Sequence, residues 1–175
     1  MSGIAGIAAK GVAGRSAARQ PGAMITVDDL MYYADVALDG MVGIVEGLGD
    51  ELANRRPPLP DANPPYVILT HCLGVMEYWA GHVIAGRDNT RDRAAEFVAT
   101  GTVADLVDRV AAARATLRRD LATLDPYAPP RGTVKDEDAD TPMGRTQGGV
   151  LLHVYEELVQ HHGQMELTRD ILRAA

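Results

Sequence analysis

Residues 151–172 read LLHVYEELVQHHGQMELTRDIL, and this stretch decides the fold class. Its apolar residues recur at steps of three and four, which is the spacing of a helix that buries one face. That face consists of Val150, Leu151, Val154, Leu158, Met165 and Leu172. A helix of this type, starting near Gln147, must pack against other elements to bury its apolar stripe.

Three upstream segments show the same helical periodicity. The expected helices cover residues 27–53, 64–85, 103–124 and 147–172. Thr26 and Thr102 precede helical segments and can cap them, and Gly86 suits the end of the second helix. No segment shows the alternation of a strand. We therefore expect an all-α fold, a four-helix bundle connected either up-down-up-down or with one crossover.

The composition is that of an ordinary globular chain, with 46% hydrophobic and 23% charged residues. The formal net charge of -7 argues against a nucleic-acid-binding module and against a polybasic membrane anchor. No run of about 18 apolar residues predicts a transmembrane helix. Cys72 is the only cysteine, which is typical of a reducing compartment, so we expect a cytoplasmic protein. Residues 1–23 are expected to form a disordered tail before one domain over residues 24–175.

Two ionisable residues lie at the edge of the apolar face of the last helix. If His153 is set at zero on a helical wheel, Gln164 lies at about 20°, Glu157 at about 40° and His161 at about 80°. Leu158 lies at about 140°, well inside the apolar face. A carboxylate in that position must be paired or bound to a metal, because burying it alone is costly. Glu157 and His161 can also simply pair with each other, one turn apart.

A second polar residue lies within an apolar face. His71 occupies the middle of the apolar stripe of the helix expected over 64–85. A lone histidine in such a place is more often a core residue with a satisfied hydrogen bond than a ligand. Taken together, however, His71, Glu157 and His161 form a His₂Glu set that could bind a divalent metal with one open position. Zinc is the first expectation, and nickel, iron and manganese stay open.

Two segments carry a resemblance to a known family. THCLGVMEYWAGHVIAGR (residues 70–87) and LLHVYEELVQHHGQMELTRDIL (residues 151–172) resemble the DinB-like superfamily of metal-binding four-helix proteins. Within it they are most similar to the mycothiol S-transferase branch, which includes the N-terminal domain of mycothiol-dependent maleylpyruvate isomerase. The metal ligands of the family fall on His71, Glu157 and His161.

The resemblance implies that a low-molecular-weight thiol such as mycothiol is activated at the metal and attacks an electrophilic small molecule. Because this chain ends at Ala175 without a second domain, a stand-alone transferase for detoxification is expected rather than an isomerase. Two alternatives stay open. The same site could use a metal-bound water in a hydrolase, or the protein could be a non-catalytic metal-binding or structural bundle.

Further candidates have a functional and a structural interpretation each. His153 could orient Glu157 from one turn away, or be an ordinary surface or interface histidine. Gln164 could hydrogen-bond a ligand or a substrate, or be a polar residue without a role. Arg87, near Arg91 and Arg93, could bind a substrate carboxylate, or belong to a solvated loop. The sequence also leaves a homodimer open, with the helix over 103–124 as the candidate surface.

Overall fold

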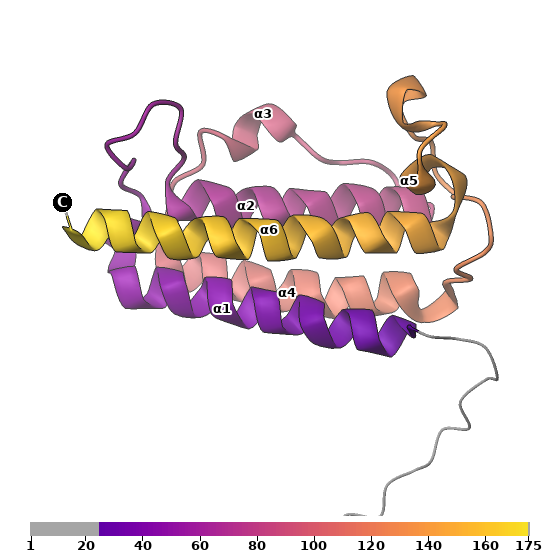
Figure 1. The fold of residues 1–175 in the computed structure, drawn as a ribbon, viewed down its shortest axis with the longest axis horizontal. Helices are drawn as coiled ribbons and strands as arrows, with labels where there is room; N and C mark the ends of the chain where they lie inside the picture. Colours follow the sequence, from indigo (N-terminus) through magenta and orange to yellow (C-terminus); the bar gives the residue numbers. More distant parts are fainter. Residues whose placement is uncertain (1–24, 175) are drawn as a thin grey trace, which may run out of the picture.

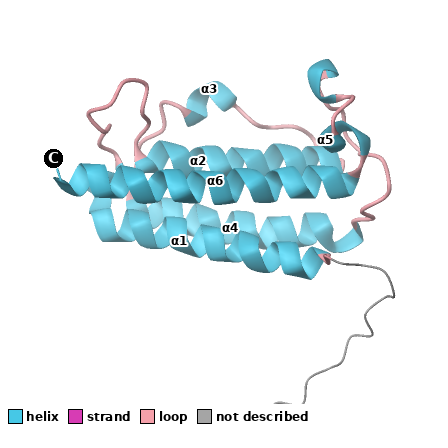
Figure 2. Ribbon diagram, viewed as in Figure 1, coloured by secondary structure: helices cyan, strands magenta, loops and turns pink. Residues whose placement is uncertain are grey.

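The computed structural model describes residues 25–174, and the tail expected over residues 1–23 lies outside this range. Within the described residues the chain forms helices, turns and loops without a strand (Figure 2). The all-α expectation is therefore confirmed for this part of the protein.

Four long helical segments lie side by side (Figure 1). They are α1 (Val27–Ala53), α2 (Pro65–Val75) with its continuation η1 (Met76–Ile84), α4 (Val103–Asp120) and α6 (Gln147–Ala174). Short helical turns occupy two connections that the sequence predicted as plain loops. These are α3 (Arg93–Glu96) in the first connection, and η3 (Asp136–Asp138) and α5 (Pro142–Arg145) in the second. The helix expected over 103–124 ends earlier, at Asp120, and η2 (Leu121–Thr123) continues it as a 3-10 turn.

The connection between η1 and α4 returns along the length of the helices (Figure 1). As a result α4 begins where α1 ends, and the Asn54 side chain donates to the Gly101 carbonyl at 2.9 Å. The Val103 N–H likewise donates to Asp50 Oδ1 at 2.7 Å. Of the two expected connectivities, the structure has the one with a crossover. This crossover carries α3 onto α2, which proves decisive for the site below.

Local capping explains where the helices begin and end. Thr26 Oγ1 accepts from the Asp29 N–H at 3.1 Å, while the Asp29 carboxylate accepts from the Thr26 N–H at 2.9 Å. This reciprocal pair is a capping box. Thr102 Oγ1 accepts from the Asp105 N–H at 3.1 Å and caps α4 in the same way. Gly86, with a φ of 76°, ends η1 in the left-handed region that favours glycine.

The second helix changes its winding half-way. The sequence predicted one regular helix to residue 85, whereas η1 is a π-helix, and the Ala85 N–H bonds the Ala80 carbonyl five residues back at 3.0 Å. Wider turns change the direction of the side chains that follow, and π-turns are frequent at functional sites. Accordingly His82 leaves the centre of the protein and bonds the Arg87 carbonyl at 2.7 Å.

The core is built from the facing apolar stripes of the long helices. Its largest fully buried side chains include Leu38, Met41, Leu69, Leu106, Leu158 and Met165. Each such side chain contributes about 1.5–3 kcal/mol of burial free energy.

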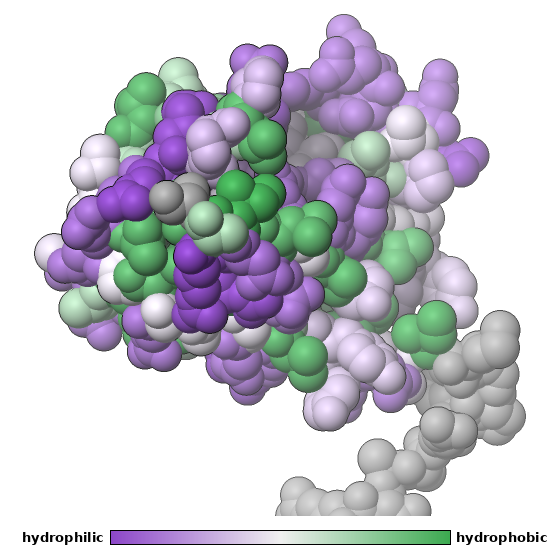
Figure 3. All heavy atoms as spheres, turned by 60° about the vertical axis from the view of Figure 1, so that its left-hand side comes forward, coloured by the Kyte–Doolittle hydropathy of each residue, from purple (hydrophilic) through white to green (hydrophobic). Residues whose placement is uncertain are grey.

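The segment Pro65–Ile84 is long and apolar enough to cross a membrane by length and composition, with a mean hydropathy of 1.2. However, 78% of that window is buried inside the protein, as in a core helix. On the face shown in Figure 3, small patches of hydrophobic residues are exposed between hydrophilic ones.

Candidate metal centre

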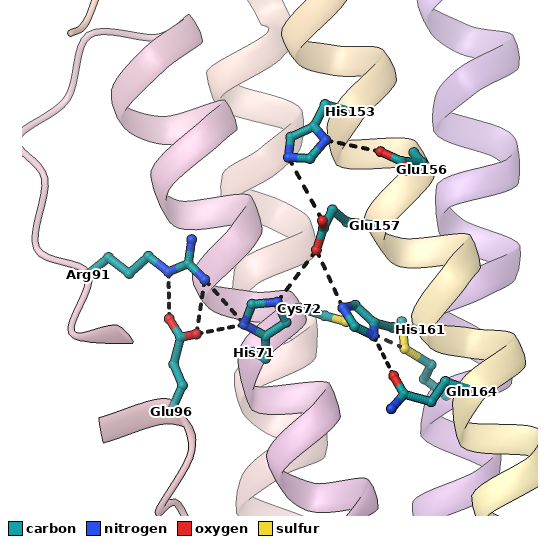
Figure 4. A network of polar contacts seen from close by, with 10 residues as sticks. His71, Cys72, Arg91, Glu96, His153, Glu156, Glu157, His161 and Gln164 are labelled. Atoms are coloured by element: carbon teal, nitrogen blue, oxygen red, sulfur yellow. Dashed lines mark hydrogen bonds and ion pairs between the residues drawn. The ribbon is translucent and has the colours of Figure 1, made fainter. Parts of the chain in front are cut away.

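Three side chains from two helices converge where α2 faces α6 (Figure 4). His71 comes from α2, and Glu157 and His161 come from successive turns of α6. Glu157 Oε2 lies 3.5 Å from His71 Nε2 and 3.4 Å from His161 Nε2. One ligand atom from each residue lies within 4.8 Å of the other two. The structure thus brings together the three residues that the sequence predicted as ligands.

The outer nitrogen of each imidazole is held by an acceptor. Glu96 Oε2 accepts from His71 Nδ1 at 2.8 Å, and Gln164 Oε1 accepts from His161 Nδ1 at 2.8 Å. An imidazole that donates from Nδ1 presents a lone pair at Nε2 when it is neutral. Both Nε2 atoms therefore face Glu157 as potential ligand atoms. Metal-binding histidines are typically held in this manner by a second hydrogen bond.

The two Nε2 atoms and the Glu157 oxygen can lie this close together only if a positive charge lies among them. Two imidazole lone pairs and a carboxylate oxygen are all acceptors, so nothing in the neutral set binds the three together. Either both rings take up an extra proton, or a cation lies between them. Two nitrogens and one oxygen are donors that suit a divalent ion such as zinc, and three protein ligands are the number found at open zinc sites. The residues present therefore fit the metal.

The electrostatics at the centre favour an ionised Glu157. Where a proton on Nε2 takes the place of the cation, hydrogen bonds from His161 and then from His71 hold the pKa of the Glu157 carboxyl well below its usual range, against the opposing effect of burial. In return, the Glu157 carboxylate raises the pKa of His161. The Glu157 side chain is 22% exposed and that of His161 is 21% exposed, so solvent reaches this side of the centre. A carboxylate that is charged at neutral pH is ready to bind a cation.

Glu96 is the residue that sequence reasoning missed. It lies on α3, is 6% exposed, and forms a two-bond ion pair with Arg91, at 2.6 Å from Nε and 2.9 Å from Nη2. Its approach to α2 depends on Gly74, because a Cβ there would lie 1.9 Å from Glu96 Oε1. A glycine within an apolar helix is the signal that could have indicated a close neighbour at this point.

Comparison with known families agrees with this geometry. Residues 29–174 match the model of the mycothiol S-transferase family. The chain belongs to this family. No curated protein matches the chain. The match covers all of the long helices except the first two residues of α1, and it confirms the resemblance seen in the two sequence segments.

In this mycothiol S-transferase family member, the remaining predicted residues lie around the centre in different ways. Gln164 bonds the ligand candidate His161, as described above. His153 Nε2 lies 3.9 Å from Glu157 Oε1, its Nδ1 lies 3.1 Å from Glu156, and its ring meets the edge of Trp79. His153, Glu156 and Glu157 also lie close enough together to hold an ion, in a set that shares Glu157 with the first.

Arg87 has a structural set of partners. Its Nη1 donates to Glu77 at 2.9 Å and its Nε to Asp120 at 2.9 Å, which joins η1 to α4. These carboxylates raise its pKa above its usual value, so the guanidinium stays charged. Gly81 makes room for it, since a Cβ there would lie 2.0 Å from Arg87 Nη2. A role for Arg87 in substrate binding stays a prediction.

Two neighbours of the ligand candidates face away from the centre. Cys72 is fully buried with its Sγ 3.9 Å from Met41 Sδ, and burial raises the pKa of its thiol. A thiol of this kind is an inert core residue. His162 lies against α1, where a Cβ on Gly40 would come within 2.1 Å of its Nε2.

Proposed function

We propose that this protein is a metal-dependent mycothiol S-transferase. His71, Glu157 and His161 would hold one divalent cation, with zinc as the first candidate, inside a DinB-like four-helix bundle with one crossover. One observation carries the proposal: both histidines are held at Nδ1 by acceptors and present Nε2 to the same carboxylate oxygen. The family match supports the thiol as the partner.

When bound, the cation would supply the positive charge that stabilises a thiolate at neutral pH, where a free thiol with a pKa near ~8.5 is mostly protonated. The chain's own residues do the positioning. Glu96 and Gln164 fix the two imidazole planes, and the half-buried side chains of Glu157 and His161 leave one flank open to solvent. The thiol and the electrophile would meet at that flank.

The transfer itself needs no further reactant. A carbon–sulfur bond forms between the thiol and the electrophilic carbon, the bond to the leaving group breaks, and that group departs with the electron pair. The thiol proton passes to solvent. Detoxification of reactive small molecules in the cytoplasm is the role that we propose for such a reaction.

The proposal is tested by elemental analysis of protein purified without a metal-binding tag. We expect about one divalent ion per chain in the wild type and its loss in His161→Ala. His162→Ala is the matched control, because it removes the neighbouring histidine, which faces α1, and should leave the metal content unchanged. If the protein takes up no metal even after zinc is supplied, Glu157 and His161 are a structural pair.

Activity provides the second test. Chlorodinitrobenzene and mycothiol serve as probe substrates, since formation of the thioether is followed by absorbance. We expect transfer by the wild-type holoprotein and only the uncatalysed rate with His161→Ala. A reaction on other substrates that proceeds without any thiol would instead favour the hydrolase alternative.

A further inference from the structure

A small pocket adjoins the candidate metal centre on the side of the crossover. It has a volume of about 180 Å³, which suits a group of roughly benzoate size. Its walls come from η1, from the crossover and from the loop before η3. The lining residues are Tyr78, Trp79, Asn89, Arg91, Arg93 and Lys135.

The lining of this pocket is positively charged, although the chain as a whole carries a net charge of -7. Three of its residues are cations and none is an acid. Arg93 stacks on the Phe97 ring at 5.5 Å and forms no ion pair with any residue that the structure describes. Lys135 is 64% exposed and lies 3.6 Å from Glu137, a loose surface pair of small energy.

Arg91 is the built-in part of the pocket. Its side chain is only 9% exposed, and Nε and Nη2 are bound to Glu96. The remaining Nη1 makes no hydrogen bond within residues 25–174 and is turned away from Glu96 (Figure 4). A guanidinium nitrogen held rigidly in this way, with its N–H groups free, is suited to an anionic acceptor.

Two residues of the pocket, Arg91 and Trp79, contact residues at or next to the centre. Arg91 Nη2 lies 3.2 Å from His71 Nδ1, directly behind one ligand candidate. The Trp79 ring meets the His153 ring at a centroid distance of 4.9 Å, and His153 in turn neighbours Glu157. A small molecule held in the pocket would therefore lie one side chain away from Glu157, with His71 on one route and His153 on the other.

We propose that this pocket binds a carboxylate group of the electrophilic substrate, so that the enzyme prefers anionic electrophiles. This inference rests on the proposed function. Arg91 Nη1, Arg93 and Lys135 supply the positive charge, and the Trp79 and Tyr78 rings contact the apolar part of the molecule. We assign the carboxylate to the electrophile and not to the thiol. The cysteine carboxyl group of mycothiol forms an amide and therefore carries no negative charge.

Binding is tested through Trp79, which is the only tryptophan of the chain and lines the pocket. Its fluorescence is followed during titration with benzoate and with benzamide, a neutral molecule of the same shape. We expect benzoate to bind at least about tenfold more tightly, as one charge-assisted contact would give. Arg93→Gln and Lys135→Gln should each reduce this preference, and Arg93→Lys should retain part of it.

Arg119→Gln is the matched control, because it removes the same charge from α4 at a residue that does not line the pocket. It should leave the preference for benzoate unchanged. Equal binding of benzoate and benzamide, or an Arg93→Gln effect no larger than that of Arg119→Gln, would overturn the inference.

Kinetics separate this inference from the proposed function. With mycothiol as the thiol, chlorodinitrobenzoate and chlorodinitrobenzene form a charged and a neutral pair of electrophiles. Arg93→Gln should lower kcat/KM for the charged substrate at least about tenfold more than for the neutral one. Normal transfer with equal losses for both substrates overturns the inference alone. Absence of both metal and thiol transfer overturns the proposed function and the assignment to an electrophile with it.

Discussion

Replacing Glu96 by glutamine should weaken metal binding although Glu96 is not a ligand. The wild-type carboxylate serves Arg91 with both oxygens while Oε2 also accepts from His71 Nδ1 at 2.8 Å. An amide has one oxygen, so its NH₂ group must face either the Arg91 guanidinium or the His71 N–H, and both are donors. Loss of such supporting bonds typically costs 10–100-fold in metal affinity, or about 1.4–2.8 kcal/mol.

The assay is competition for zinc between the purified protein and a chromophoric chelator. Glu166→Gln is the control, because Glu166 is an exposed carboxylate on the same helix as two ligand candidates and belongs to neither group of residues that could hold an ion. We expect affinity to fall at least about tenfold in Glu96→Gln and to change little in Glu166→Gln. Equal zinc affinity of wild type and Glu96→Gln would refute the role assigned to this bond.

Glu96→Ala gives a second, different expectation and shows why glutamine is the better probe. Removing the carboxylate leaves the Arg91 guanidinium, 9% exposed, without its partner. Breaking a buried ion pair in this way costs about 3–5 kcal/mol of folding stability. Urea unfolding of the metal-free proteins should therefore show a large loss for Glu96→Ala and a smaller one for Glu96→Gln.

Three further outcomes are expected. Gly86→Ala should lose about 1–2 kcal/mol in urea unfolding, because residue 86 has a φ of 76°. Arg87 lowers the pKa of Glu77 below 4.5, so this carboxylate stabilises the fold above that pH. The stability difference between wild type and Glu77→Gln should therefore shrink as the pH falls below 4.5. Finally, EDTA should lower the Tm of the zinc-loaded wild type and leave that of His161→Ala unchanged.

Three boundaries of the long helices could be predicted because their signals are local, whereas α4 ends at Asp120 and not at the expected residue 124. Thr26 and Thr102 bond N–H groups three residues on, and Gly86 adopts a backbone conformation that few other residues tolerate. The π-helical winding of η1 could not be predicted, because a helical wheel drawn from the sequence assumes that every turn is a regular α-helical turn. The short turns in the connections escaped for the opposite reason, since they contain too few residues to show a period.

The same distinction between local and distant information divides the candidate site. Glu157 and His161 are one turn apart on an uninterrupted helix, so their common face follows from the sequence. The inward position of His71 could also be predicted, because it follows from the apolar stripe of its own helix. Glu96, in contrast, reaches His71 from 25 residues away, and it does so because the crossover lays α3 on α2. The path of the crossover is not encoded in any periodicity of the sequence. The contact between Glu96 and His71 therefore could not be predicted.

Arg91, in the same crossover, has two roles: it supports Glu96, and it lines the proposed anion pocket. The sequence presents it as one of several cations in a polar connection, where a solvated loop is favoured over a role in substrate binding. In the structure two of its nitrogens fix Glu96, and through Glu96 the His71 ring, while the side chain also lines the neighbouring pocket. A single buried guanidinium thus links the support of the ligand candidate His71 to the proposed recognition of an anion. Binding at the pocket and binding at the centre should therefore influence each other, because both depend on the orientation of the same side chain.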